Sequence, residues 1–364
     1  MNTVNDAASL AQALTGGVAL AATRLYLQTG ACRLRIRSNS KPLLEHLAHY
    51  FAHVATSPGE ADIEIIAIER DEPQLAIDFI DWKREPGKTG RKDSYADFPD
   101  ARLVRKVRTG MLFLQSTGYS IAAGACLRHD NQVINFINAQ YMNWLQQRGW
   151  LICHAAGLVN NGRTLGLAGF SGGGKSTLML RLLDQPDNRY LSNDRLFIRR
   201  EGEQVQAAGI PKLPRINPGT IVHNPRLHAL IDAAERERLL ALPPQQLWDL
   251  EDKYDVMMNE VYGPGKIAQD APLQAFLVLN WQRDSSEPAR LQRVDLAQRR
   301  ELLGAIMKSP GPFLQRSDGS FLQDDEPLAQ QPYLEALRGI PVYEASGGVD
   351  FDAIQKHIQR TLWA

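Results

Sequence analysis

Hydrophobic and polar residues alternate over short stretches in the first third of the chain. Between Cys32 and Ser38, Leu34 and Ile36 stand between arginines, which is the period-two pattern of a strand with one buried face. Glycine-containing turns at residues 109–110 and 117–118 separate further apolar stretches. The pattern predicts strands at residues 32–38, 62–69, 103–107, 111–116 and 119–123, and the last three form a meander.

Two stretches in the same part of the chain repeat their apolar residues at helical spacing. One is residues 43–51, which follow Pro42, a residue that the first turn of a helix tolerates. The other is residues 133–145, and Gly149 after it favours a helix C-cap. Residues 83–100 are polar and rich in Gly, Pro and charge, as in a solvated loop. The alternative is that the cations of this segment form a binding patch (Lys83, Arg84, Lys88, Arg91 and Lys92).

The pattern changes after residue 150. Residues 151–159 and 163–169 predict two strands joined by a turn, and the second strand leads directly into a glycine-rich sequence. Further strands are predicted at residues 190–199, 274–281 and 340–344, and helices at residues 227–250 (broken at Pro243-Pro244), 296–307 and 351–362. This order predicts two domains, an N-terminal α+β domain over residues 1–130 and an α/β nucleotide-binding domain over residues 131–364.

Composition and charge narrow the functional classes. The 364 residues include 41 Lys and Arg and 41 Asp and Glu, so the formal net charge is zero, and we expect no nucleic-acid partner. The N-terminus lacks the basic residues of a signal peptide, and no apolar run approaches the roughly 18 residues of a membrane span. Three cysteines without C-x-x-C spacing predict buried, reduced thiols. We therefore expect a cytoplasmic protein that does not bind membranes.

The glycine-rich sequence at residues 169–177 satisfies the pattern G-x-x-x-x-G-K-[ST] in full. Glycines allow backbone conformations in which successive N–H groups turn inward around phosphate oxygens. In this pattern Lys175 reaches the β- and γ-phosphates, and the Ser176 hydroxyl is a ligand of Mg²⁺. The pattern predicts ATP and Mg²⁺ as cofactors, bound by Gly169, Ser171, Gly172, Gly173, Gly174, Lys175, Ser176 and Thr177.

The residues on both sides of this sequence support the same interpretation. An apolar strand (residues 165–168) precedes it, and leucines at helical spacing follow it. A helix that starts near Ser176 directs its positive end at a bound anion. This context disfavours the alternative of a flexible glycine linker.

Three segments together resemble the catalytic core of HPr kinase/phosphorylase and its relatives, a core that also resembles that of PEP carboxykinase. They are residues 153–157 (Cys-His-Ala-Ala-Gly), residues 169–177, and residues 190–196 (Tyr-Leu-Ser-Asn-Asp-Arg-Leu). The HPr-kinase-related branch called kinase B resembles the chain most, because it also contains the sequence at residues 209–220. The clear similarity covers about residues 140–225, and it implies a P-loop-containing, HPr-kinase-like α/β core.

The resemblance also implies roles for single residues. His154 would lie near the transferred phosphate, and Asp194 would hold Mg²⁺ directly or through water. The position of Asn193 is an aspartate in HPr kinase, where it acts as general base on the acceptor hydroxyl. A neutral amide cannot accept that proton. Three possibilities stay open: His154 is the base, the transfer needs little base assistance, or no transfer occurs.

Lys212 and Arg215 belong to a proline-rich stretch that resembles the family's region next to the phosphate or acceptor. Two cations in a stiff loop suit an anion clamp, and the planar fork of an arginine binds phosphate with two hydrogen bonds. The alternative is an exposed loop with ordinary charges.

The resemblance implies an ATP- and Mg²⁺-dependent kinase that transfers the γ-phosphate to a hydroxyl of a protein serine or a small molecule. His154, Lys175, Asn193, Asp194 and Arg215 are the candidate catalytic residues, Lys212 assists phosphate binding, and Ser176 and Asp194 are the candidate metal ligands. The alternatives are an ATP-binding regulatory module without transfer and a PEP-carboxykinase-like decarboxylating enzyme. HPr kinase assembles as a hexamer, so the resemblance leaves a homo-oligomer open.

Overall fold

The computed structural model of the chain describes residues 4–84, 89–170, 172–250 and 252–363. The chain divides into two compact units, each with a large β-sheet. The first unit extends to Gly149 and also includes residues 309–327, and the second unit comprises residues 150–308 and the chain after residue 327. The division therefore differs from the one predicted at residue 130.

The sheet of the first unit has eight strands in the order β1-β2-β3-β8-β7-β6-β5-β4. β2 pairs with β3 in parallel, β3 pairs with β8 in parallel, and the other neighbours are antiparallel. The strands are β1 (Leu25–Thr29), β2 (Cys32–Ser38), β3 (Ile63–Glu69), β4 (Ile80–Asp81), β5 (Asp93–Asp97), β6 (Ala101–Lys106), β7 (Leu112–Ser116) and β8 (Ser120–Gly124). The predicted strands in this region are confirmed, but β5 lies inside the segment predicted as a loop.

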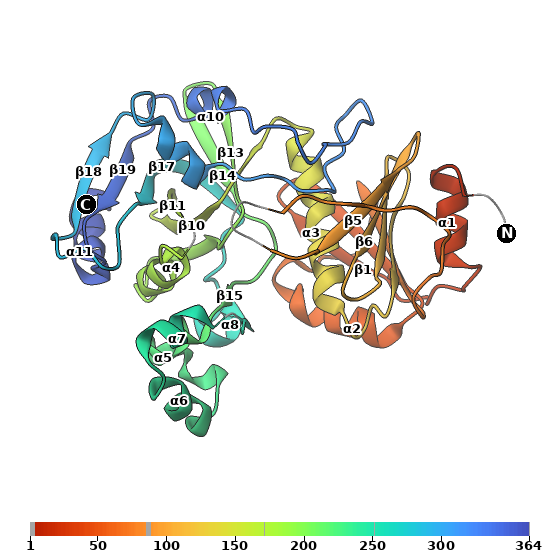
Figure 1. The fold of residues 1–364 in the computed structure, drawn as a ribbon, viewed down its shortest axis with the longest axis horizontal. Helices are drawn as coiled ribbons and strands as arrows, with labels where there is room; N and C mark the ends of the chain where they lie inside the picture. The colour runs from red at the N-terminus through yellow and green to blue at the C-terminus, as the bar shows by residue number, and fades with distance from the viewer. Residues whose placement is uncertain (1–3, 85–88, 171, 251, 364) are drawn as a thin grey trace. The chain divides into compact units, whose positions relative to one another are not determined.

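Helices cover both faces of this sheet, and Figure 1 shows α1 (Ala7–Thr15) and α3 (Asp130–Gln146) on opposite sides. α1 packs its leucines into a buried cluster with side chains of β6, β7 and β8. On the other face, α3 and α2 (Lys41–Tyr50) contact β2. Phe136 of α3 packs against Phe113 at 5.0 Å between ring centroids. This packing explains why α3 belongs to the first unit and not, as predicted, to the second.

Residues 309–327 follow most of the second unit in the sequence but belong to the first unit, where Arg102 holds them. The side chain of Arg102 is fully buried and donates hydrogen bonds to the carbonyl oxygens of Pro312 and Leu322. It also forms an ion pair with Asp97 and lies over the ring of Phe321 at 4.8 Å. The sequence pattern contained no signal for this return.

The sheet of the second unit has nine strands, with β12-β10-β11-β17-β14-β13-β9 in order; β19 also pairs with β17, and β18 pairs with β19. β11, β17 and β19 are parallel, whereas β10 is antiparallel to both β11 and β12. The strands are β9 (Leu151–Cys153), β10 (Ala155–Asn160), β11 (Arg163–Gly169), β12 (Arg189–Ser192), β13 (Leu196–Glu201), β14 (Gln204–Ala208), β17 (Asp270–Leu279), β18 (Arg290–Val294) and β19 (Val342–Ser346).

Two predicted strands of the second unit are interrupted. The strand predicted at residues 151–159 breaks at His154 into β9 and β10, and the one predicted at 190–199 breaks after Ser192 into β12 and β13. In both cases the two halves pair with different neighbours. The polar residues predicted within strands therefore lie at strand ends, where side chains are free to face a ligand.

The helices of the second unit are shorter than predicted. The segment at 227–250 forms η2 (Pro225–Leu230), α6 (Ala233–Leu240) and α7 (Pro244–Asp249), and the segment at 296–307 contains only η3 (Arg300–Leu302) and α9 (Leu303–Ile306). α9 and α10 (Gln331–Ala336) contribute to the main buried cluster. Figure 1 shows α5 (Pro218–Val222), α6 and α7 as a separate group of helices, which has its own small apolar cluster. The pair β15 (Arg215–Ile216) and β16 (Tyr254–Asp255) connects this group to the sheet.

The three cysteines are free and buried, as predicted. Among the described residues, no helix combines the length and the apolar composition that crossing a membrane requires.

Candidate functional site

Strand register brings three separate segments of the second unit to one edge of the sheet. Ala155 at the start of β10 pairs with Ala168 near the end of β11. Gly157 of the same strand pairs with Ser192, the last residue of β12. His154, the glycine-rich loop after β11 and the residues after β12 therefore lie at the same edge. The carboxyl ends of parallel strands are the usual place for ligands in open α/β sheets.

The glycine-rich loop (residues 169–177) connects β11 to helix α4 (Lys175–Leu183). Gly174 precedes the helix at a φ of 80°, a left-handed conformation that favours glycine. A Cβ atom at Gly174 would also lie 2.7 Å from the ring of Phe351, so a side chain does not fit there. Ser171, which the sequence pattern includes in the loop, lies outside the described residues.

Side chains from the end of the neighbouring strand β17 hold the loop backbone. Trp281 donates its indole N–H to the carbonyl oxygen of Gly173 at 2.9 Å, and Arg283 donates to the carbonyl oxygen of Gly172 at 3.1 Å. The ring of Trp281 also meets Phe351, the first residue of α11 (Phe351–Thr361), edge to face at 5.0 Å. Because the Gly173 carbonyl points to Trp281, the N–H of the same peptide plane, that of Gly174, points the other way.

Lys175 is held inside the site. Its Nζ donates to the carbonyl oxygen of Gly169 at 3.0 Å and lies 3.2 Å from Nε2 of His154. Burial lowers the pKa of Lys175 to about 8, although the nearby Asp194 carboxylate opposes this shift. An ammonium group with a lowered pKa gains from an anion close to it. An anion bound here would therefore compete with the two internal contacts of Lys175.

His154 and Lys308 each contact one carboxylate oxygen of Asp194. Nε2 of His154 lies 3.1 Å from Oδ1, and Nζ of Lys308 lies 3.2 Å from Oδ2. Burial alone raises the pKa of Asp194, but the hydrogen bond from His154 and the charges of Lys308 and Arg195 outweigh it. The pKa of Asp194 is thus held well below its usual range, and the carboxylate is ionised at neutral pH.

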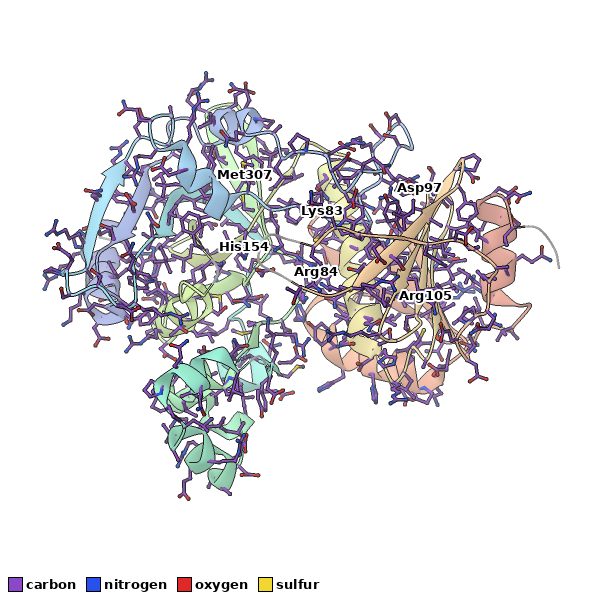
Figure 2. The ribbon with its side chains drawn as sticks, in the orientation of Figure 1. Lys83, Arg84, Asp97, Arg105, His154 and Met307 are labelled. Atoms are coloured by element: carbon purple, nitrogen blue, oxygen red, sulfur yellow. The ribbon has the colours of Figure 1, made fainter. Side chains whose placement is uncertain are left out.

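The break between β9 and β10 positions His154 and Lys308 together. The backbone N–H of His154 donates to the carbonyl oxygen of Ile306 at 2.7 Å, and Cys153 forms a β-bridge with Met307. Figure 2 labels His154 and Met307 in this part of the second unit. Nε2 of His154 contacts both Lys175 and Asp194, so it cannot accept a proton from a substrate while it donates to the carboxylate.

The helix start contributes hydroxyl groups to the same edge. The Ser176 hydroxyl donates to Oδ1 of Asn193 at 2.8 Å, and the hydroxyl oxygens of Thr177 and Thr220 lie 3.1 Å apart. The first contact joins the loop to the β12 edge, and the second joins α4 to α5. Asn193 therefore acts in the free chain as a hydrogen-bond acceptor.

The donor set around Ser176 fits Mg²⁺, which takes oxygen ligands from one or two carboxylates and from substrate phosphates. Ser176 and Asn193 offer a hydroxyl and an amide oxygen 2.8 Å apart, and Asp194 is the next residue. The described part of the chain contains no group of three or more His, Cys, Asp or Glu side chains that could hold a metal alone. Ser176 and Asp194 are the residues at this edge that would hold the metal.

Lys212 lies in the segment between β14 and β15, and Arg215 is the first residue of β15. Burial and the positive charge of Arg195 lower the pKa of Lys212 to about 7, and Asp194 opposes this shift. Arg215 forms an ion pair with Asp255 at 3.1 Å. The structure therefore places Lys212 in the same electrostatic environment as Asp194, whereas the nearest acidic partner of Arg215 is Asp255.

Four residues of this edge were missed from the sequence: Lys308, Trp281, Arg283 and Phe351. Lys308 directly follows a segment predicted as a helix, and no motif identifies it. Trp281 is the last residue of the predicted buried strand at 274–281, and Arg283 follows that strand. The rule that ligands bind at the carboxyl ends of parallel strands is the signal that could have drawn attention to them.

Comparisons with known proteins give a likeness to solved structures and no match in sequence. The sequence matches no family model and no curated protein. One of the solved structures that the chain resembles is the Hpr(Ser) kinase/phosphatase from Coxiella burnetii, with a TM-score of 0.30 and 11% sequence identity. The match covers 58% of this chain and 90% of that one. A likeness at this TM-score does not indicate what the chain binds or does.

Proposed function

We propose that the chain is an ATP- and Mg²⁺-dependent kinase that transfers the γ-phosphate to a hydroxyl of a protein serine or a small molecule. One observation carries the proposal: Lys175 and Asp194 both contact Nε2 of His154 at the edge where the glycine-rich loop begins a helix. Phosphoryl transfer needs positioning and charge neutralisation more than covalent chemistry. A half-buried lysine, an ionised aspartate and a helix N-terminus supply both.

Each residue then has a defined task. The N–H groups at the start of α4 and that of Gly174 bind phosphate oxygens. Lys175 turns from Gly169 and His154 to the β- and γ-phosphates. Ser176 and Asp194 would hold Mg²⁺, which neutralises charge on the phosphates. Lys212 adds positive charge near Asp194, and the acceptor approaches from the side of His154 and Asn193.

Either His154 activates the acceptor hydroxyl as general base, or the transfer proceeds without a base. Asn193 has no basic atom, and its amide oxygen already accepts the hydrogen bond of Ser176. His154 can serve as base only after its Nε2 has left Asp194 and Lys175. A metal on Asp194 and a phosphate on Lys175 are the events that would release it.

A second candidate function is an ATP-binding regulatory module without phosphoryl transfer. The contact between Ser176 and Asn193 favours it, because an amide at position 193 ties down the loop and offers no base. The other residues at the edge serve nucleotide binding in both cases.

The decisive experiment is ³¹P NMR of the full chain with Mg²⁺ and ATP in the presence of protein extract or pools of small hydroxyl compounds. We expect a new phosphorylated product with the wild type and with Lys356→Ala, an exposed control in α11. We expect none with Lys175→Ala. ATP binding without product, even in Asn193→Asp, would support the regulatory module, and absence of ATP binding by the wild type would contradict both functions.

A further inference from the structure

Lys308 has a defined place next to Asp194. Its Nζ lies 3.2 Å from Oδ2, and its side chain is 14% exposed, against 49% for Asp194. A lysine that is this buried at the rim of a site has lost much of its hydration, and it stays there because the carboxylate compensates the charge. The contact therefore differs from an ion pair between two fully exposed side chains.

The backbone around Lys308 is fixed. The N–H of Met307 donates to the carbonyl oxygen of Leu303 at 2.8 Å, and the bridge between Met307 and Cys153 holds the segment against β9. The positive charge of Lys308 also contributes to the lowered pKa of Lys175, which places the two ammonium groups in one electrostatic environment. The backbone next to Lys308 is thus held in place, and the side chain extends from it to Asp194.

The position of Lys308 opposes direct coordination of a metal by Asp194. Oδ1 is engaged by His154 and Oδ2 by Lys308, so each oxygen already has a partner, although a carboxylate keeps further lone pairs for a cation. A divalent cation on this carboxylate repels an ammonium group about 3 Å from one of its oxygens, and the repulsion favours the departure of that group.

We propose that Lys308 is a positioning residue that holds Asp194 in the metal-free chain and is displaced from it when a divalent cation binds. The displaced ammonium group then turns to the nearest anion, the terminal phosphate of a bound nucleotide. In this arrangement one side chain couples metal binding to nucleotide binding. The second half of the inference rests on the proposed nucleotide binding, and the first half does not.

The first half is tested with Mn²⁺ alone, titrated into the nucleotide-free full chain and followed by electron paramagnetic resonance. We expect Lys308→Met to bind Mn²⁺ roughly three- to tenfold more tightly than the wild type, the size of effect that a partly exposed charge exerts. Lys356→Met, which removes an exposed lysine of α11, is the matched control and leaves the affinity unchanged. A change of less than twofold in Lys308→Met, or weaker binding, overturns the proposal.

Two further variants separate charge from packing. Lys308→Arg keeps the positive charge and should bind Mn²⁺ as the wild type does, whereas Lys308→Gln should behave as Lys308→Met does. In an Asp194→Asn background, Lys308→Met should have no effect on Mn²⁺ affinity. If the arginine variant binds Mn²⁺ as tightly as the methionine variant, or if the effect persists without Asp194, the competition does not exist.

The second half is tested by ATP binding at saturating Mg²⁺ and in EDTA. We expect Lys308→Met to bind ATP several-fold more weakly than the wild type when Mg²⁺ is present, because the phosphate then lacks the displaced ammonium group, and to differ little from the wild type in EDTA, where Lys308 stays on Asp194. Equal affinity of the two proteins for ATP at saturating Mg²⁺, or a loss confined to EDTA, contradicts the second half. If the wild type binds no ATP at all, the proposed function fails, while the Mn²⁺ titrations still decide the relation between Lys308 and Asp194.

Discussion

The ammonium group of Lys175 lies 3.2 Å from Nε2 of His154 and donates to the carbonyl oxygen that ends β11. The lysine of the glycine-rich loop is thus turned inward in the nucleotide-free chain. Burial lowers its pKa to about 8, so the group that should receive phosphate is half deprotonated at mildly alkaline pH. This state has consequences for the pH dependence of nucleotide binding.

ATP binding should take up protons at pH 8. The pKa of Lys175 is about 8 in the free chain, and a bound phosphate raises it, so the complex holds a proton that half of the free molecules lack. Affinity therefore falls as the pH rises above 8. Calorimetry in buffers of different ionisation enthalpy measures the uptake. Lys175→Arg should remove this share of the uptake, because a guanidinium group stays protonated; equal uptake in both proteins would rule out this origin.

Asp194 should stabilise the fold at neutral pH and lose that effect in acid. Its pKa is lowered in the folded chain, so the stabilisation is fully present above the unfolded value of about 3.9 and is lost as the pH falls through the lower, folded value. Asp194→Asn should therefore lower Tm at pH 7, with a smaller difference at pH 3. Circular dichroism melts at the two pH values test this, and a difference that grows in acid would contradict it.

Much of the sheet structure could be predicted from the sequence, because strands with one buried face leave a period-two pattern. The strand at 32–38 is an example: its predicted bounds are those of β2. The helix at 296–307 shows the limit. Its apolar residues pack into the main cluster from irregular chain, and only residues 303–306 are α-helical. Apolar side chains pack into a core from helical and from irregular backbone alike, so their spacing alone does not reveal the backbone conformation.

The candidate site could be predicted in part for a similar reason. The loop from Gly169 to Thr177 is local in sequence, so its pattern is readable. The contact between Asp194 and Lys308 joins residues more than a hundred positions apart, and it depends on a break in a predicted strand at His154. No periodicity encodes such a break, because both halves of the strand are apolar.

Trp281 should set the affinity of the loop for phosphate. Trp281→Phe removes the donor to the Gly173 carbonyl oxygen but keeps a ring against Phe351. Loss of one neutral hydrogen bond that orients the loop should weaken ATP binding by roughly three- to tenfold. Fluorescence titration with a labelled nucleotide measures this.

Trp144→Phe is the matched control for that measurement, because the indole N–H of Trp144 is buried without a hydrogen-bond partner in the described part of the chain. Its replacement should leave ATP affinity unchanged. If Trp281→Phe binds ATP as the wild type does, the Gly173 peptide is oriented by the loop backbone alone.

Arg102 should be the residue on which the return of residues 309–327 to the first unit depends. It is fully buried, pairs with Asp97 and donates to two carbonyl oxygens of that segment. Arg102→Met leaves those acceptors unsatisfied and should cost roughly 3 kcal/mol of unfolding free energy.

Arg105→Met is the control, and Figure 2 labels Arg105 in the same unit. The ion pair of Arg105 with Glu72 is about 40% exposed on both sides, so its loss should cost at most about 1 kcal/mol. Urea unfolding measures both. Limited proteolysis should then cut Arg102→Met first within residues 309–327, and equal stability of the two variants would show that the aromatic packing, not the guanidinium, holds the segment.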